Sequence, residues 1–170
     1  MQPQQARFLL EFLLPQVEKE SAITRRVLAA IPEDRREYRP DTTSRNAQEL
    51  AWHIVSSEIW FLEGIVHGHF GDEQKMPSQF KTIGDILSWY DRNVPDLVRQ
   101  VKALNDEQLA REIPFFGIMN EAAVAYLGLL SSHSCHHRGW LAAYLRPMGA
   151  KVPSIYGGSA DEPFQMTAQS

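Results

Sequence analysis

Hydrophobic and polar positions alternate with a helical period along most of the chain, and this pattern predicts four long helices. The predicted helices cover about residues 4–31, 46–66, 82–101 and 121–146. Each is long enough to bury an apolar stripe against the others, and the connectors between them are shorter than the helices. The pattern therefore predicts an all-α fold, a four-helix bundle with an irregular C-terminal tail.

Local signals mark the ends of three of these helices. Asn46 is followed three residues later by Glu49, and Thr82 is followed in the same way by Asp85. This spacing is typical of a capping box, in which each side chain binds the other residue's backbone N–H at a helix start. Pro147 ends the last predicted helix, because proline cannot continue it.

Two prolines fall inside predicted helices. Pro15 lies in the first helix and indicates a kink there, or the start of its regular part. Pro95 lies in the third helix and is expected to bend or split it. The apolar positions that define the first helix follow helical spacing at Phe8, Phe12, Ile23, Val27 and Ile31.

The remaining segments predict loops rather than regular structure. HGHFGDEQKMPSQF, after the second helix, is a loop by its Gly and Pro content, and NDEQLAREIPFFGIMN connects the third and fourth helices. The tail from about residue 147 is irregular, with Tyr156 and Phe164 as its candidate anchors on the bundle. We find no internal repeat and no strand-like alternation, so residues 1–170 are predicted to form a single domain.

Composition is that of a soluble globular protein. Of the 170 residues, 44% are hydrophobic and 22% are charged, and the net charge is −4 with no dense basic block. A nucleic-acid partner is not expected, because phosphate binding needs a concentrated basic surface. No stretch approaches the length of a membrane span, so no membrane partner is expected either.

The cysteine count and the N-terminus favour a cytoplasmic protein. Cys135 is the one cysteine in the sequence, so no disulfide can form within the chain, and a reducing compartment is consistent with this. The early run FLLEFLLP is short, contains Glu11 and lacks a clear cleavage site. It indicates the apolar side of a helix rather than a signal peptide.

Three histidines lie on the apolar faces of two predicted helices. His133 and His137 are four residues apart, so they point the same way one turn apart, and His53 lies on the apolar face of the second helix. If these faces meet in the core, three neutral imidazoles can bind Zn²⁺, Ni²⁺ or a similar ion and leave a coordination position open. The alternative is that they are hydrogen-bonded core histidines with no metal.

The other histidines are weaker candidates. His136 competes with its neighbour His137 for the inward position, but the row formed with Leu130 and Leu141 favours His137, which places His136 at the surface or beside the site. His67 and His69 form an H-G-H loop that is either a weak metal site or, as we favour, simply solvated.

Several nearby residues can be placed by helical phase. Cys135 is expected to face away from the histidines as a small buried hydrophobe, and Glu58 is a poor ligand because it lies about 140° around the helix from His53. Glu58 can instead contact a neighbouring helix. Arg138 and Arg146 are expected to be solvated or helix-end charges. Candidate pocket-lining residues, one or two turns from the ligands, are Tyr126, Trp140 and Tyr144.

The segments ELAWHIVSSEIWFLEGIV and HSCHHRGWLAAYLRPMG together resemble the DinB/YfiT-like superfamily. IPEDRREYRPDTTSRNAQEL and VPSIYGGSADEP are similar to other parts of its members. The resemblance implies a four-helix bundle whose metal site takes one histidine from the second helix and two from the last, by position His53, His133 and His137. One departure is Trp140, where many relatives have Gln after HRG, and this implies a bulkier and more apolar pocket.

The resemblance also implies properties that spacing does not give. The metal in such proteins is often zinc or nickel, and homodimers are common. Some relatives use a low-molecular-weight thiol, as in mycothiol-dependent isomerases and bacillithiol S-transferases, while others have no established activity.

Three hypotheses follow for function. The first is a metal-dependent enzyme with a small-molecule substrate, acting as a thiol S-transferase or a related isomerase or hydrolase. The second is a metal-binding bundle without catalysis, acting in stress response or sensing. The third is a helical dimer whose histidines serve the core and bind no metal. The residues leave the general acid or base unassigned.

Overall fold

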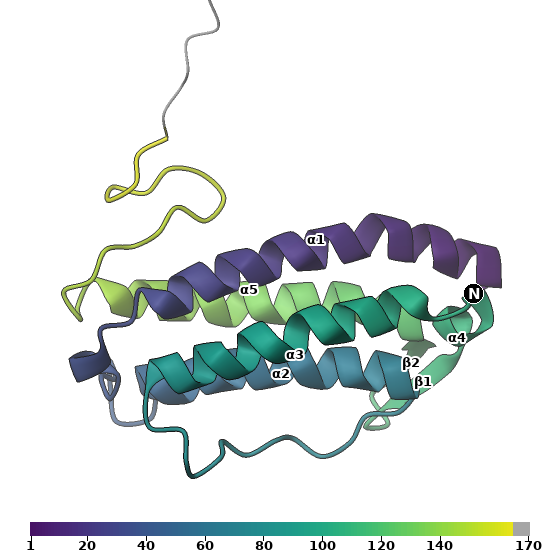
Figure 1. Ribbon diagram of the computed structural model, residues 1–170, viewed down its shortest axis with the longest axis horizontal. Coiled ribbons are helices and arrows are strands. Elements are labelled where there is room, and N and C mark those ends of the chain that lie inside the picture. The colour runs from purple at the N-terminus through teal and green to yellow at the C-terminus, as the bar shows by residue number, and fades with distance from the viewer. Residues whose placement is uncertain (165–170) are drawn as a thin grey trace, which may run out of the picture.

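A computed structural model describes residues 1–164, and it shows a bundle of four long helices (Figure 1). The long helices are α1 (Pro3–Ala29), α2 (Ala47–His67), α3 (Ile83–Ala103) and α5 (Tyr126–Leu145). The short elements are η1 (Glu33–Arg35), α4 (Asp106–Ala110), β1 (Glu112–Phe115), β2 (Met119–Ala122) and η2 (Ala123–Ala125). The prediction of a mostly helical bundle is confirmed.

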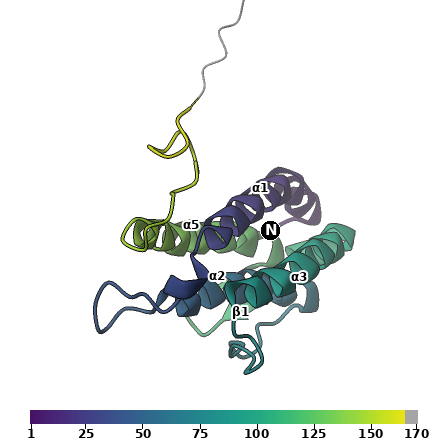
Figure 2. The same ribbon diagram turned by 60° about the vertical axis from the view of Figure 1, so that its left-hand side comes forward.

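The four helices form a ring in which each long helix contacts two others. α2 packs against α3 and α5, and α1 packs against the same two helices (Figures 1 and 2). α1 and α5 run in one direction, and α2 and α3 run in the other. The parallel pair requires a long connection, so residues 68–82 return along the length of the bundle beneath α2 (Figure 1). The α2–α5 and α1–α3 seams therefore lie on opposite sides of the ring.

The capping boxes form as predicted and fix where two helices begin. Asn46 Oδ1 accepts from Glu49 N, and a Glu49 carboxylate oxygen accepts from Asn46 N, both at 2.8 Å. Thr82 and Asp85 make the same reciprocal pair at the start of α3. Gly68 ends α2 with a φ of 80°, a left-handed conformation that suits a residue without a Cβ.

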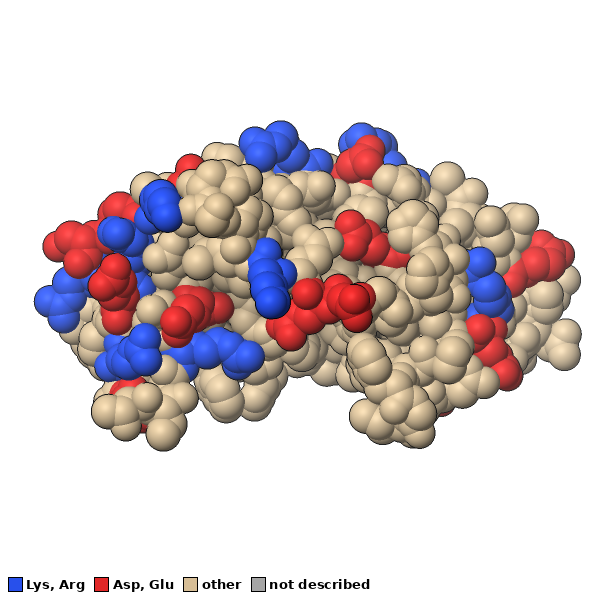
Figure 3. All heavy atoms as spheres, turned by 90° about the horizontal axis from the view of Figure 1, so that it is seen from below, with Lys and Arg blue, Asp and Glu red and all other residues tan. Residues whose placement is uncertain are grey.

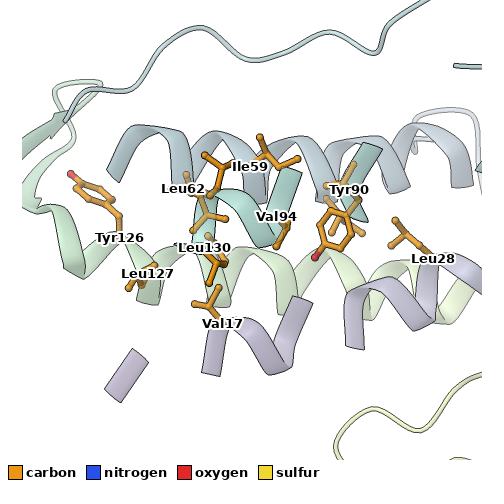
Figure 4. Packing of buried hydrophobic residues seen from close by; sticks show 14 of the residues in the cluster. Val17, Leu28, Ile59, Leu62, Tyr90, Val94, Tyr126, Leu127 and Leu130 are labelled. Carbon is orange, nitrogen blue, oxygen red and sulfur yellow. The ribbon is translucent and has the colours of Figure 1, made fainter. Parts of the chain in front are cut away.

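The core is built from the inward faces of all four helices. Val17 of α1, Ile59 and Leu62 of α2, Val94 of α3 and Leu130 of α5 meet in its middle (Figure 4). Each of these side chains is at most 6% exposed. Because burying such a side chain contributes about 1.5–3 kcal/mol, this layer holds the helix positions on which the histidines depend.

The expected apolar face of α1 is wrong at its N-terminal end. Phe8 and Phe12 are 68% and 61% exposed, although Val27 and Ile31 are buried as expected. The buried stripe contains smaller residues, at Ala6, Leu10, Leu14, Val17, Ser21, Thr24 and Leu28. Close packing against α3, α4 and α5 selects this stripe over the one with the largest apolar side chains.

Both internal prolines are accommodated within continuous helices. α1 runs through Pro15 and α3 runs through Pro95, so the expected split of α3 does not occur. Pro15 lies on the exposed face of α1, where water can satisfy the carbonyl that loses its intrahelical partner.

The connector before α5 contains strands that the sequence did not predict. β1 and β2 pair antiparallel with Ile113 opposite Glu121, and the turn between them includes Phe116 and Gly117 at positive φ. Glu121 was expected to begin the last helix, but it belongs to this hairpin, so α5 begins at Tyr126. Phe115 anchors the hairpin on the bundle by packing against Phe61, Phe70 and Tyr126.

The tail is irregular over residues 147–164, as predicted. Its anchors are Tyr156, whose hydroxyl reaches Glu20 and Cys135, and Glu162, which pairs with Arg26 at 2.6 Å. Phe164 is 73% exposed and is not the anchor expected of it.

The surface carries charges of both signs. On the face shown in Figure 3, Lys and Arg side chains lie among Asp and Glu side chains rather than forming one basic patch. None of the helices in the described part of the chain is long and apolar enough to cross a membrane.

Candidate metal centre

The α2–α5 seam brings together the three histidines selected from the sequence. His53 lies on the second turn of α2, and His133 and His137 lie one turn apart on α5. One ring nitrogen from each lies within 4.8 Å of the other two, and each residue is partly buried. His53 Nε2 and His137 Nε2 are 3.2 Å apart. The helical phase of these residues was therefore sufficient to identify the cluster.

The donor geometry fits a divalent metal ion. Two imidazole nitrogens bound at about 2.0–2.1 Å to one tetrahedral ion lie about 3.4 Å apart, close to the separation of His53 and His137. The Nδ1 atoms of all three histidines are buried without a hydrogen-bond partner in residues 1–164. The feature that indicates a ligand site is the convergence of one ring nitrogen from each of the three histidines within 4.8 Å, which is the donor set of a catalytic metal centre. Three imidazoles suit zinc and nickel among other ions.

Burial and neighbouring charge keep the cluster neutral. Burial lowers the pKa of His133 and of His137 to about 4, and the charges of the surrounding histidines and of Arg45 add to this. Burial also lowers the pKa of His53, with Arg45 contributing and Glu73 opposing. Neutral imidazole is the form that coordinates a metal, so at neutral pH no proton has to leave before a metal binds.

The other histidines lie outside the cluster. His136 is exposed, and its ring packs against Trp140 with centroids 4.7 Å apart. His67 and His69 are exposed at the end of α2, with ring centroids 6.1 Å apart. Among residues 1–164, these two belong to no group of three metal-binding side chains. The predicted preference for His137 over His136 is consistent with this geometry.

One of the three proposed pocket residues, Trp140, lies against a histidine, and Tyr144 lies in the adjoining hollow. The Trp140 ring meets the His137 ring edge-on with centroids 5.4 Å apart, and it is half exposed. Tyr144 follows one turn later, and its hydroxyl lies 3.4 Å from the backbone oxygen of Arg45. Both line a hollow of about 490 Å³ between α5 and the start of α2.

The third proposed pocket residue, Tyr126, lies elsewhere. Its side chain is 1% exposed and packs against Phe70 and Phe115 at the hairpin end of the bundle. Its hydroxyl donates to the backbone oxygen of Ile113 at 2.6 Å. The expectation that Tyr126 lines the histidine pocket is therefore wrong, because the unpredicted hairpin covers this first turn of α5.

Sequence reasoning missed two charged residues at the mouth of the cluster. Glu73, from the long loop, has Oε1 3.6 Å from His53 Nδ1. This is an ion-pair distance rather than a hydrogen bond. Arg45 precedes the α2 cap and lines both the 490 Å³ hollow and a second hollow of about 460 Å³ that contains His53 and Glu73. No local signal marks either residue, because a loop that crosses the bundle brings Glu73 to the site.

A second polar cluster lies inside the bundle, on the faces of α2 and α5 that turn toward α1 and α3. Glu58 is 1% exposed and accepts hydrogen bonds from Ser21, Thr24 and Tyr90. Burial raises the pKa of Glu58, which favours the neutral carboxylic acid. The expectation that Glu58 contacts neighbouring helices instead of joining the histidines is consistent with this.

Arg138 belongs to the same interior network, and the expectation that it is a solvated charge is wrong. It is 1% exposed, donates to Thr24 Oγ1 at 3.0 Å and forms an ion pair with Glu20. Cys135 faces away from the histidines as predicted, but it lies in this polar environment and contacts Tyr156 and Glu20. Arg146 is 54% exposed at the helix end and pairs with Asp161 at 3.0 Å.

Comparisons with known proteins agree with this fold. The family model described as DinB family matches residues 5–166. An uncharacterized protein of Bacillus subtilis strain 168, YjoA, is 31% identical over 130 residues, which are 75% of this chain and 82% of that protein. The crystal structure of the DinB-like protein YjoA from Bacillus subtilis superposes with a TM-score of 0.71 at 27% identity, covering 85% of this chain and 96% of that one.

A second solved structure shows the same fold. A DinB-like protein from Bacillus cereus ATCC 10987 has a TM-score of 0.74 at 23% identity, covering 86% of this chain and 97% of that one. At this identity the likeness concerns the fold alone.

Proposed function

Because this chain belongs to the DinB family, we propose that its three-histidine cluster holds a divalent metal and that the protein is a metal-dependent enzyme. The proposed chemistry is S-transfer from a low-molecular-weight thiol, or a related isomerisation or hydrolysis. The observation that carries the proposal is the meeting of three partly buried, neutral imidazoles, each with a ring nitrogen within 4.8 Å of those of the other two.

The metal is proposed to be zinc or nickel. Three protein ligands leave at least one position for a small molecule, as in catalytic sites, whereas structural zinc sites take four protein ligands. When bound, such an ion lowers the pKa of a coordinated thiol or water and so supplies a nucleophile at neutral pH.

The neighbouring residues have roles that follow from their contacts. His53, His133 and His137 hold the ion. Glu73 faces His53 Nδ1 at 3.6 Å, where a carboxylate favours the Nδ1–H tautomer and directs Nε2 toward the ion. Trp140 packs against His137 and covers one side of the cluster, which limits water there.

In the proposed S-transfer, the thiol first loses its proton to solvent. Its sulfur then forms a bond to an electrophilic carbon of the second substrate, and the leaving group departs with the electron pair of the bond that breaks. No oxidant or reductant is required, so atoms and electrons balance between the two substrates.

A turnover assay with defined metal loading tests this proposal. Protein freed of metal by chelation and reloaded with Zn²⁺ or Ni²⁺ is assayed with 2-mercaptoethanol or cysteine and with 1-chloro-2,4-dinitrobenzene or monobromobimane as the electrophile. We expect conjugation above the uncatalysed rate only in the loaded protein. His137→Ala is expected to abolish it, and His136→Ala, which alters an exposed neighbour, is expected to retain it.

The assay also separates the alternatives. Metal-dependent turnover that disappears in His137→Ala supports the enzyme. Stoichiometric metal without turnover, together with a cobalt-substituted spectrum that does not change when thiol is added, would favour the non-catalytic metal-binding bundle. If the protein binds no metal, the three histidines would be core residues without a metal-binding role.

A further inference from the structure

The hollow next to the histidines has one charged residue among those that line it. It is lined by Thr43, Ser44, Arg45, Leu50, Trp140 and Tyr144 and has a volume of about 490 Å³. Leu50 and Tyr144 are 1% and 9% exposed, so they form its floor, while Trp140 is half exposed and forms an open wall. The space is therefore mainly apolar and aromatic, with one positive group.

The charge of Arg45 is not neutralised by an ion pair in the described part of the chain. The nearest arginines in the sequence are paired: Arg36 lies 3.6 Å from Glu33, and Arg39 lies 3.8 Å from Glu49. Asp41 and Glu49 are the nearest carboxylates in the sequence, each four residues away. Asp41 accepts hydrogen bonds from Thr43 and Ser44, and Glu49 accepts from Asn46 N, so neither is bound by Arg45. A guanidinium that has no carboxylate partner and lies next to an apolar hollow can form an ion pair with the carboxylate of a ligand.

Arg45 is also close enough to the histidines to influence them. Its charge lowers the pKa of His53, His133 and His137. Arg45 lines the hollow that contains His53, and the aromatic wall on the other side, Trp140, contacts His137. The 490 Å³ hollow therefore adjoins the histidine cluster through Arg45, which also lines the hollow that contains His53, and through Trp140.

The two hollows differ in their charges. The hollow that contains His53 shares Arg45 with the first hollow and also has Lys75, Glu49 and Glu73 among its lining residues, so it contains carboxylates that the first hollow lacks. A third hollow, between α1 and α3, is lined by Arg25 and Asp91, which already pair at 2.7 Å, and by Ser21 and Tyr90, which bind Glu58. The hollow at Trp140 thus combines an unpaired cation with apolar walls.

We propose that this hollow binds a small thiol that carries a carboxylate, with the carboxylate on Arg45 and the sulfur directed toward the histidine cluster. This inference rests on the proposed metal-dependent function and adds the class of thiol that the site accepts. Arginine matches a carboxylate with two parallel N–H donors, so the pairing fixes orientation as well as charge. The apolar walls suit a short carbon chain between the two ends.

The test compares two thiols that differ in charge alone. Cobalt-loaded protein is titrated with 3-mercaptopropionate and with its neutral counterpart 3-mercaptopropionamide, and binding is followed by the sulfur-to-cobalt absorption. In the wild type we expect the carboxylate to bind about tenfold more tightly, as for one charge-assisted pair. In Arg45→Gln we expect the two affinities to become equal, with the affinity for the amide unchanged.

Two control variants make the result specific. Arg39→Gln removes a nearby positive charge that already pairs with Glu49, and it is expected to keep the tenfold preference. Arg45→Lys keeps the charge but loses the planar donor fork, and it is expected to keep only part of the preference.

The outcomes separate this inference from the proposed function. If cobalt binds but the wild type does not distinguish the two thiols, the inference is overturned while the metal site stands. A preference that persists in Arg45→Gln also overturns it. If no cobalt binds at all, the metal-dependent function fails, and the inference fails with it.

Discussion

α2 and α5 contribute to two polar clusters, and the clusters differ in how many of their polar atoms have hydrogen-bond partners. In the interior cluster, Glu58 accepts from three hydroxyl groups and Arg138 is bound by Glu20 and Thr24. In the histidine cluster, three Nδ1 atoms have no hydrogen-bond partner in residues 1–164. Both clusters are made of polar side chains in a helical bundle. In the interior cluster the charged side chains have partners and Ser134 Oγ is the buried atom without one in residues 1–164, whereas in the histidine cluster every member has an unpaired Nδ1.

The difference indicates which cluster is structural and which binds a ligand. A buried network whose polar groups have hydrogen-bond partners holds its helices together and leaves no polar group to bind a ligand. In the histidine cluster one ring nitrogen from each of three residues lies within 4.8 Å of the other two, so these donors converge on a common point and indicate a site. Four predictions test this division, in order of decreasing expected effect.

Loss of Arg138 should destabilise the protein most. Arg138→Ala leaves Glu20 and Thr24 without their partner inside the bundle, and breaking a buried pair in this way costs about 3–5 kcal/mol. Urea unfolding of the metal-free protein measures the change. Arg146→Ala, which removes an ion pair at an exposed helix end, should cost less than about 1 kcal/mol. Equal losses in the two variants would contradict a structural role for the interior network.

The stability of the metal-free protein should fall in acid because of the histidines. His133 and His137 have pKa values lowered from 6.5 to about 4 in the folded protein. The unfolded chain therefore binds more protons between these values, and this contribution to stability is complete above pH 6.5 and lost as the pH falls toward 4. Each shift corresponds to about 3 kcal/mol at full strength, and because both imidazoles are partly exposed and solvent screens their charge, we expect a combined decrease of about 2–3 kcal/mol.

The double variant His133→Gln/His137→Gln isolates this contribution. Its carboxylates titrate as in the wild type, so the difference between the two pH profiles reports the histidines. The two profiles should run parallel above pH 6.5, where the histidines are neutral, and the wild type should lose stability relative to the variant as the pH falls toward 4. Profiles that stay parallel down to pH 4 would show that the histidines are not held neutral.

Replacing Glu58 by its neutral isostere should have a small effect. Burial raises the pKa of Glu58, which favours the carboxylic acid in the folded protein, and Gln has a similar shape and no charge. We expect Glu58→Gln to cost about 1 kcal/mol, close to the value of one hydrogen bond, in thermal unfolding. Glu58→Lys serves as the matched contrast, because it buries an uncompensated charge. A loss in Glu58→Gln as large as in Glu58→Lys would mean that the buried group is charged.

Removing the Tyr156 hydroxyl should have the smallest effect. The hydroxyl contacts Glu20, Cys135 and Arg138 at the exposed edge of the interior network, and the tyrosine is 68% exposed. Tyr156→Phe is expected to cost about 0.5–1 kcal/mol in urea unfolding, because water can replace the lost contacts. A cost comparable to that of Arg138→Ala would show that the tail is an integral part of the network.

Features that depend on local signals could be predicted from the sequence. The starts of α2 and α3 follow from the two capping boxes, and the cluster of His53, His133 and His137 follows from helical phase. Each of these depends on residues within one or two turns of a helix, together with the expectation that apolar faces meet.

Features that depend on how distant segments pack could not be predicted in this way. Phe8 and Phe12 appeared to define the buried face of α1, but packing placed the smaller residues inside. Arg138 appeared to be a solvated charge because its partner Glu20 lies 118 residues away on α1. Glu73 reaches His53 only because the long loop returns beneath α2. The spacing of residues along the chain does not predict these contacts, because they join segments that are distant in the sequence.

The most direct test of the central claim is elemental analysis of tag-free protein, with the wild type beside His137→Ala and His136→Ala. We expect close to one divalent metal ion per chain in the wild type and in His136→Ala, and its loss in His137→Ala. Absence of metal from all three after loading and desalting would contradict it. Equal metal in His137→Ala and the wild type would contradict the assignment to the α2–α5 cluster and direct attention to His136 or to the exposed pair His67 and His69.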